Sequence, residues 1–268
     1  MNPFPKQILS FDLKPIDFER KLGEIGHIIL VGSGKGGVGK SFISCGIALK
    51  FAEGGKRVGL LDIDLHGASL PSYLGLKPPV RSTKMGLEPK RKSKNLKVMS
   101  VALLTGNLPV PIRGEEKNNA ILQLFSLTNW GKLDFLIVDL PPGTGDELLS
   151  AFSLFRREKS SLVLVTTPSI NASLIVSRLG ALARAEGVPI SGIVVNMAFS
   201  NSGGLVEYPF GKLDCKSIER TLDSQVLVEI PLDPRVNNQP IQEVILGKND
   251  ISKRFRDLID ALQTTICH

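Results

Sequence analysis

The sequence has little of what a secreted, disulfide-bonded or membrane-spanning protein needs. Among its 268 residues there are only three cysteines, Cys45, Cys215 and Cys267. Their spacing suits neither a disulfide framework nor a self-contained metal knuckle. No apolar run approaches the roughly 18 residues of a membrane span, and the first residues lack the basic and apolar regions of a signal peptide. These absences favour a cytoplasmic protein without a transmembrane segment.

The composition is that of a globular protein with an excess of positive charge. Hydrophobic residues make up 42% and charged residues 22%, which excludes a mostly disordered chain. Lys and Arg number 33 against 26 Asp and Glu, so the formal net charge is +7. This excess favours an anionic partner such as nucleotide, nucleic acid or acidic lipid, and charge alone does not choose among them.

Short apolar runs alternate with segments of helical period. The runs lie at residues 27–31, 58–61, 98–101, 135–138, 162–165, 193–195 and 226–230. They lack polar alternation and therefore predict strands that are buried on both faces. Between two of them, Ile43, Ile47 and Phe51 repeat every four residues, as on one face of a helix. The alternation predicts an α/β fold with a doubly wound, mostly parallel β-sheet flanked by helices. We expect residues 23–268 to form one domain and residues 1–22 to be an N-terminal extension.

A glycine-rich segment joins the first predicted strand to the first predicted helix. In this context it matches the pattern G-x-x-x-x-G-K-[ST], and its residues are Gly34, Lys35, Gly36, Gly37, Val38, Gly39, Lys40 and Ser41. Glycines let the backbone wrap closely around phosphate oxygens, and the helix N-terminus adds its positive dipole end. We expect Lys40 to reach the β- and γ-phosphates of ATP and Ser41 to ligate Mg²⁺. The sequence therefore predicts a P-loop.

Carboxylates follow two of the apolar strands. Asp62 and Asp64 close the second strand, and Asp139 closes the strand at 135–138 in a Walker B pattern. α/β sheets bind ligands at the carboxyl ends of their strands. A lone aspartate at a strand end is more often a turn or cap residue, and it is the nearby P-loop that favours a Mg²⁺ site at Asp139.

Lys35 is a second lysine inside the loop, and with it the segment resembles the deviant Walker A motif K-G-G-x-G-K-[ST] of the MinD, ParA and nitrogenase-reductase ATPases. The resemblance implies a homodimer in which Lys35 reaches the nucleotide of the partner subunit and neutralises charge during phosphoryl transfer. It also implies that Asp64 orients the attacking water and that Asp62 is a Mg²⁺-water or switch residue. Lys35, Lys40 and Asp64 are thus the expected catalytic residues of an ATPase. The alternative for Lys35 is a solvated loop lysine.

Ordered blocks narrow the resemblance to the Mrp family, whose members are ATP-dependent scaffold and carrier proteins for iron–sulfur clusters. The blocks are residues 60–76, 97–100, 112–114, 134–146, 166–168, 195–197 and 230–234. The resemblance implies that residues 141–146 are switch II, that Asn196 bonds adenine edge atoms, and that the backbone from Pro231 to Asp233 lines the base pocket. It implies as partners a second copy of the chain and client or iron–sulfur assembly proteins.

The sequence departs from that family in the residues that would hold a cluster. The Mrp pattern carries C-P-x-C shortly after N-M, so that two pairs supply four thiolates in the homodimer, whereas residues 200–203 here are Ser, Asn, Ser and Gly. Ser and Asn cannot replace the soft thiolates of an iron–sulfur cluster. Direct cluster binding is therefore disfavoured. Cys215 leaves an atypical site open beside the simpler interpretation of a half-buried cysteine.

Phe42 is a second departure within the expected nucleotide site. The class usually has a Thr there whose hydroxyl contacts the α-phosphate. Loss of one hydrogen bond costs about 0.5–1.5 kcal/mol, so nucleotide binding weakens at most roughly tenfold. The phenyl ring can instead extend the apolar face of the helix.

The basic segment 77–97 bears on the rival functions. It carries eight basic residues against the single acid Glu88, with prolines and no periodicity. A solvated loop is the simplest interpretation and an acidic protein partner is an alternative, while nucleic acid is disfavoured because no aromatics are interleaved to stack bases.

The rival function is a ParA- or MinD-like positioning ATPase that binds DNA or membrane in its ATP state. The main hypothesis is an Mrp-like dimeric ATPase switch in iron–sulfur cluster assembly.

Overall fold

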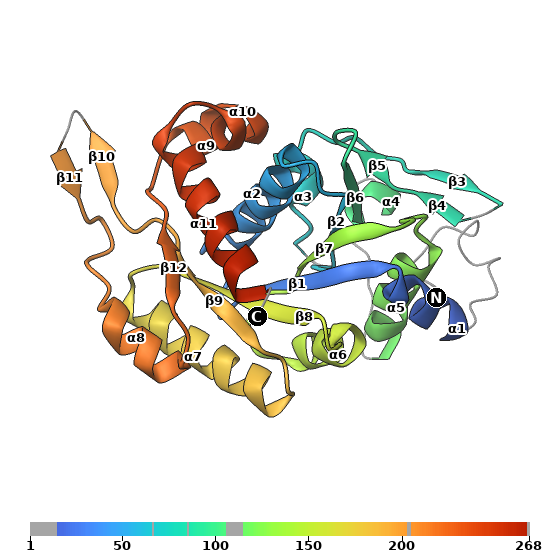
Figure 1. Ribbon diagram of the computed structural model, residues 1–268, viewed down its shortest axis with the longest axis horizontal. Coiled ribbons are helices and arrows are strands. Elements are labelled where there is room, and N and C mark those ends of the chain that lie inside the picture. The colour runs from blue at the N-terminus through green and yellow to red at the C-terminus, as the bar shows by residue number, and fades with distance from the viewer. Residues whose placement is uncertain (1–14, 66, 85, 106–114, 203–204, 267–268) are drawn as a thin grey trace.

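A twisted sheet forms the centre of the computed structural model, which describes residues 15–65, 67–84, 86–105, 115–202 and 205–266. In the described chain it has eight strands in the order β12-β9-β8-β1-β7-β2-β6-β5. These are β1 (Ile25–Ser33), β2 (Val58–Asp62), β5 (Lys90–Arg91), β6 (Leu96–Ser100), β7 (Leu133–Asp139), β8 (Ser160–Thr166), β9 (Ile190–Val195) and β12 (Val226–Glu229). All neighbours pair in parallel except β5 and β6. The predicted mostly parallel sheet is confirmed (Figure 1).

The strand order reverses direction at β1. From β1 the chain moves outward to β2 and β6 and returns with β7 beside β1. It then crosses to the other side and continues through β8, β9 and β12. Open α/β sheets bind ligands at the carboxyl ends of the strands where such a reversal occurs. The glycine-rich loop follows β1 directly, so the topology places it at that point.

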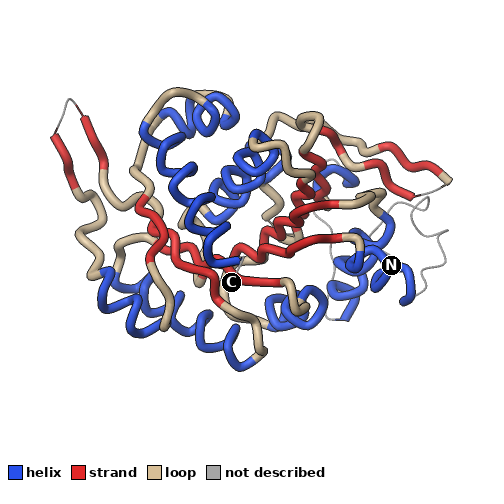
Figure 2. The backbone as a smooth tube through the Cα atoms, in the orientation of Figure 1, coloured by secondary structure: helices blue, strands red, loops and turns tan. Residues whose placement is uncertain are grey.

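Helices cover both faces of the sheet (Figures 1 and 2). They are α1 (Pro15–Gly23), α2 (Lys40–Glu53), α3 (Leu70–Tyr73), α4 (Ala102–Thr105), α5 (Glu115–Leu127), α6 (Asp146–Phe155), α7 (Ile170–Ala185), α8 (Cys215–Leu222), α9 (Arg235–Asn238), α10 (Ile241–Leu246) and α11 (Asp250–Ile266). Successive residues of β1 point to opposite faces: Leu30 joins the core under α1, α5, α6 and α7, and Ile29 joins the core under α2, α10 and α11. Two cores therefore sandwich the sheet, which explains why its strands are apolar without alternation.

Helix α11 packs closely on α2, the helix that begins at the glycine-rich loop. A Cβ added at Gly46 of α2 would lie 2.0 Å from the Phe255 ring, so only glycine lets the two helices approach this far. The Phe42 ring also meets Phe255, edge to face, with centroids 5.4 Å apart. The Phe42 side chain thus belongs to the core rather than to the loop.

Residues 15–22 of the expected N-terminal extension lie in α1. Phe18 contacts the rings of Phe125 and Phe155, so α1 packs on α5 and α6. The first fourteen residues of the extension lie outside the described residues.

Two short ribbons leave the body at opposite ends of the molecule (Figure 2). One pairs β3 (Arg81–Thr83) with β4 (Gly86–Glu88), and the other pairs β10 (Ser200–Ser202) with β11 (Leu205–Glu207). The second ribbon exposes apolar side chains, with Leu205 63% exposed. No described helix combines the length and apolar character that crossing a lipid bilayer requires.

Candidate nucleotide-binding site

The glycine-rich loop adopts a backbone that side chains would block. Gly37 and Gly39 have φ angles of 81° and 87°, in the left-handed region that favours glycine. A Cβ added at Gly39 would lie 2.1 Å from Asn196 Nδ2, so this position also needs glycine for close approach. Asn196 Nδ2 donates a hydrogen bond of 2.8 Å to the Val38 carbonyl. The predicted base-contacting residue is therefore held directly against the loop.

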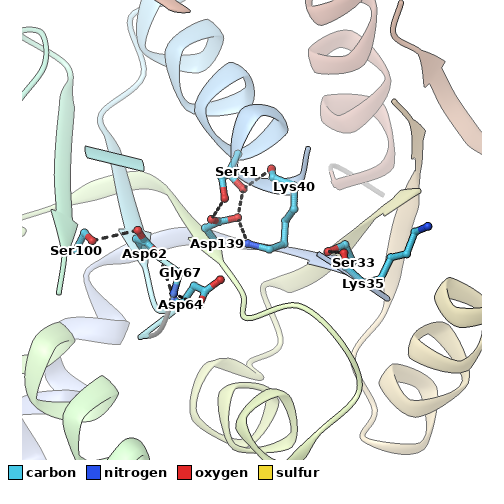
Figure 3. Close-up of polar contacts among 10 residues, drawn as sticks. Ser33, Lys35, Lys40, Ser41, Asp62, Asp64, Gly67, Ser100 and Asp139 are labelled. Carbon is cyan, nitrogen blue, oxygen red and sulfur yellow. Dashed lines mark hydrogen bonds and ion pairs between the residues drawn. The ribbon is translucent and has the colours of Figure 1, made fainter. Parts of the chain in front are cut away.

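The first turn of α2 converges on Asp139 at the end of β7 (Figure 3). Ser41 Oγ donates to Asp139 Oδ2 at 2.6 Å, and Ser44 Oγ donates to Oδ1 at 2.7 Å. Lys40 Nζ lies 2.7 Å from Asp139 Oδ1. The structure thus brings together Lys40, Ser41 and Asp139, which the sequence assigned to phosphate and Mg²⁺.

Lys40 has a close counter-ion, but its ammonium has no hydrogen-bond acceptor among the residues that the structure describes. The Lys40 side chain is 6% exposed, and its contact with Asp139 has the distance of an ion pair without the angles of a hydrogen bond. Its Nζ consequently has no hydrogen-bond partner among the described residues. A buried donor without an acceptor is costly, about 1–3 kcal/mol and more for a charged group. Phosphate oxygens at the α2 N-terminus would supply the missing acceptors, so the residues present fit a nucleotide.

Asp62 lies beside Asp139 because β2 and β7 pair in register at these residues. Asp62 Oδ2 accepts from Ser100 Oγ at 3.0 Å, and Oδ1 accepts from the Asp64 backbone N–H at 3.1 Å. Burial, and then the charge of Asp139, raises the pKa of Asp62 to about 8. Two buried carboxyl groups side by side favour the binding of a cation. The cation would lie between the carboxyl pair and a bound phosphate, and Mg²⁺ prefers such oxygen ligands.

Asp64 lies in the loop that follows β2. Its Oδ1 accepts from the Gly67 backbone N–H at 2.9 Å, which folds the loop around the carboxylate (Figure 3). In the expected switch II segment, the Gly143 N–H donates to the carbonyl of Ser33, the last residue of β1, at 2.9 Å. Both segments expected to sense the γ-phosphate therefore begin at the site. Residues 112–114, another block of the resemblance, lie outside the described residues.

Lys35 is directed away from the Lys40–Asp139 cluster (Figure 3). Its carbonyl accepts from Ser33 Oγ at 3.1 Å, which fixes the backbone of the loop. Its ammonium makes no hydrogen bond or ion pair with another residue that the structure describes. The predicted reach of Lys35 to a partner subunit stays a prediction.

The segment from Pro231 to Asp233 lies beside the residues that follow Asn196. The Leu232 N–H donates to the Phe199 carbonyl at 2.7 Å, which pairs the two segments. Pro231 and Asp233 line a cavity of about 320 Å³. Hydrogen bonds from Arg235 lower the pKa of Asp233, so that carboxylate is held as an anion. The assignment of this cavity to adenine stays a prediction.

Sequence reasoning missed two hydroxyl groups that complete the site. Ser44 lies three residues after Ser41, and side chains at that spacing share one face of a helix. Ser100 ends β6 in register with Asp62. The helical spacing was a usable signal for Ser44, whereas the place of Ser100 follows only from the strand order.

The described thiols do not resemble ligands of an iron–sulfur cluster. Cys45 is fully buried in α2, and burial raises the pKa of its thiol well above the usual value. Burial and then Glu229 raise the pKa of Cys215 to about 11, so its thiol stays protonated at neutral pH. Among the described residues no three His, Cys, Asp or Glu side chains are grouped to hold a metal ion. Cys267 and residue 203 lie outside the described chain.

Comparison with known proteins gives a family for this arrangement. The family described as ParA, NUBPL iron-transfer P-loop NTPase, matches residues 24–264. The chain is 38% identical over 236 residues to the iron-sulfur cluster carrier protein of Saccharolobus solfataricus, covering 86% of this chain and 78% of that one. It is 37% identical to a cytosolic Fe-S cluster assembly factor NUBP2 homolog of Dictyostelium discoideum, covering 81% of this chain and 84% of the other.

A solved structure agrees with these relatives. The nucleotide-binding protein of Archaeoglobus fulgidus in complex with ADP superposes with a TM-score of 0.77 at 31% sequence identity. The match covers 91% of this chain and 98% of that chain. The likeness therefore extends over the sheet, the glycine-rich loop and the flanking helices alike.

Proposed function

This chain belongs to the ParA-type family of NUBPL iron-transfer P-loop NTPases, and on that premise we propose that it is a Mg²⁺-dependent ATP switch serving iron–sulfur cluster assembly in the cytoplasm. The observation that carries the proposal is the buried Lys40 ammonium, which has Asp139 beside it and no hydrogen-bond acceptor among the described residues. A group held in this way at a helix N-terminus is suited to phosphate. Relatives named as iron-sulfur cluster carrier and assembly proteins supply the cellular role.

Different residues would bind the phosphates, the metal ion and the base of the nucleotide. Lys40 and the backbone N–H groups of the loop would hold the β- and γ-phosphates. Ser41 and Asp139 would hold Mg²⁺, whose charge neutralises phosphate oxygens when it is bound. Asn196 and the segment from Pro231 to Asp233 would hold the base. Nucleotide entry would replace the present Ser41–Asp139 hydrogen bond by ligation to the ion.

We also propose that hydrolysis requires two copies of the chain. Asp64 would orient the attacking water, and Lys35, which is directed away from its own Lys40, would reach the nucleotide of the partner subunit. The switch II segment touches the P-loop strand through Gly143 and Ser33, so a change at the γ-phosphate would be passed to α6, which starts at Asp146.

The cluster itself we place with the partners of this protein rather than within it. Residues 200–203 are Ser, Asn, Ser and Gly where the Mrp pattern has C-P-x-C, and the thiol of Cys215 is protonated and bonded to Glu229. Thiolates are the ligands that iron–sulfur clusters use. The proposed role is therefore that of an ATP-driven accessory factor that acts on iron–sulfur assembly proteins.

Calorimetry with Mg·ATP tests the nucleotide site. We expect wild-type protein to bind Mg·ATP and the Lys40→Ala variant to lose measurable binding. Lys56→Ala, which removes an exposed lysine just before β2, serves as the matched control and binds as wild type does. Absence of heat with wild-type protein would refute the proposal.

Anaerobic reconstitution with iron and sulfide tests the accessory role. We expect no stable visible absorbance in the wild-type protein after desalting, and the same result for Cys215→Ser. A stoichiometric cluster in the wild type that is lost in Cys215→Ser would show that the chain carries its own cluster. A cluster that survives that substitution would reject the accessory role equally.

A further inference from the structure

A cleft separate from the nucleotide site lies between α3 and the pair α9–α10. Its volume is about 580 Å³, within the roughly 300–1,000 Å³ range of ligand pockets. Lys92 closes one side, and the two walls are lined by Ser69, Ser72, Tyr73, Leu74 and Gly75 and by Val236, Asn237, Gln239, Pro240, Ile241 and Gln242. Figure 1 shows α9 and α10 at the top of the molecule, with α2 and α3 beside them.

The lining of this cleft has the chemistry of a peptide site with a bias for negative charge. Lys92 is the only charged residue that lines it, and no carboxylate does so among the described residues. Lys92 Nζ donates one hydrogen bond of 2.8 Å to the Leu74 carbonyl, and a lysine ammonium has three donors. The carbonyl of Leu74, just after α3, therefore fixes the ammonium in place while two donors remain for a ligand. The amide side chains of Asn237 and Gln242 and the apolar Val236 and Pro240 complete the surface.

The positive charge continues beyond the mouth of the cleft. Lys90, Arg91 and Lys94 flank Lys92 along β5 and the following turn. In the described chain no ion pair joins any basic residue of segment 77–97 to a carboxylate, and its one acid, Glu88, accepts instead from Asn129 Nδ2 at 2.7 Å. Arg91 even stands opposite Lys97 in the antiparallel pair of β5 and β6, where like charges repel. The segment thus presents unneutralised charge beside the cleft.

We propose that this cleft binds an acidic peptide segment of a partner protein. A carboxylate of the peptide meets Lys92, neighbouring acidic residues meet Lys90, Arg91 and Lys94, and the amides of Asn237 and Gln242 bond its backbone. An apolar side chain of the peptide packs on Val236 and Pro240. Single-stranded nucleic acid fits less well, because Tyr73 is the one aromatic residue among the described residues that line the cleft, and successive bases need several rings to stack on.

Both walls of the cleft are helices that follow nucleotide-site loops. α3 begins three residues after Gly67, which binds the Asp64 carboxylate. α9 begins with Arg235, which is paired to Asp233 of the expected base pocket. A change in either loop therefore moves a wall, and peptide affinity should differ between nucleotide-free and Mg·ATP-bound protein. This coupling rests on the proposed function, whereas peptide binding does not.

Fluorescence anisotropy on nucleotide-free, full-length protein tests the docking site. The probe is a short labelled peptide of alternating Glu and Leu, with a Gln-and-Leu peptide as its control. We expect the acidic peptide to bind to the wild-type protein. In Lys92→Gln its affinity should be roughly tenfold lower, because one charge-assisted hydrogen bond is lost. Gln242→Glu, which places a like charge in the cleft without touching Lys92, should weaken it similarly. Lys216→Gln, an exposed lysine of α8, is the charge-matched control and should bind as wild type does.

The outcomes of this experiment test peptide binding independently of the proposed nucleotide site. Equal binding of the acidic peptide by wild type and by both cleft variants would overturn it, as would equal binding of the Gln peptide. Duplex DNA or phosphatidylglycerol vesicles that displace the peptide at matched salt, and lose binding in Lys92→Gln, would assign the cleft to those ligands instead. An affinity that Mg·ATP changes in wild type and not in Lys40→Ala supports the coupling. An unchanged affinity in wild type refutes the coupling alone.

Discussion

Asp62 and Asp139 stand in register on the neighbouring strands β2 and β7, both buried at the carboxyl end of the sheet. In the nucleotide-free protein two adjacent carboxyl groups compete for ionisation, and Lys40 and Ser41 lie against Asp139. Asp62 is consequently the group that keeps its proton. Binding of a cation at this edge would remove the conflict, which supports the Mg²⁺ position proposed above.

This arrangement predicts a pH dependence of stability. The folded-state pKa of Asp62, about 8, lies above the unfolded value of about 4. Because the pKa is raised on folding, Asp62 stabilises the folded protein fully at pH values below its unfolded-state pKa. This stabilisation is lost as the pH rises through its folded-state pKa. We expect the free energy of unfolding of nucleotide-free protein to fall between about pH 4 and pH 8, and Asp62→Asn to flatten that fall. Urea unfolding across this range, followed by circular dichroism, measures it. Parallel curves for the two proteins would contradict the prediction.

Asp139→Asn tests the Mg²⁺ position. The substitution keeps the shape of the side chain and removes the charge that Ser41 and Lys40 now contact. We expect Mg²⁺ to tighten ATP binding in wild type and to lose that effect in the variant, with Mg·ATP affinity at least roughly tenfold lower. Calorimetry with and without Mg²⁺ provides the comparison. Asp134→Asn, at a surface carboxylate paired with Arg57, is the control. An intact Mg²⁺ effect in Asp139→Asn would place the metal elsewhere.

Lys35→Ala separates binding from turnover. Because the Lys35 side chain is directed away from Lys40 and Asp139, its loss should leave nucleotide binding by a monomer nearly unchanged. Turnover should fall on the order of a hundredfold, as when one stabilising donor is removed from a transition state. Phosphate release at several protein concentrations measures this, and wild-type turnover should rise more steeply than linearly with concentration. Equal loss of binding and turnover in Lys35→Ala would instead make Lys35 a ligand within its own subunit.

Phe42→Thr restores the hydroxyl that the deviant Walker A class usually carries. The Phe42 ring is 4% exposed and packs on Phe255, so removing it leaves a cavity between α2 and α11. We expect a loss of about 3 kcal/mol in the free energy of unfolding, together with nucleotide binding up to tenfold tighter. Thermal unfolding and calorimetry on one preparation check both. Unchanged stability would show that Phe42 does not support the packing of α11.

The sequence was sufficient for most of the sheet and for part of the site. Runs such as 162–165 are apolar without alternation because β8 is buried at all seven positions, and this made the parallel sheet predictable. The cluster of Lys40, Ser41 and Asp139 was predictable because the motif fixes its loop and parallel strands end at one edge. The hydrogen bond from Ser100 to Asp62 was not, since it depends on β6 lying next to β2. The bond from Asn196 to Val38 joins residues 158 positions apart, a proximity that only the folded chain sets.

The close contact of Gly46 with Phe255 bears on how the chain matures on the ribosome. α2 and α11 lie far apart in the sequence, so the side of α2 that meets Phe255 stays uncovered until α11 has been synthesised. A nascent chain can form the central strands early and still lack the support that sets the helix of the phosphate loop. A contact between residues so far apart in the sequence forms late in synthesis, and shorter nascent chains present that apolar side of α2 to chaperones.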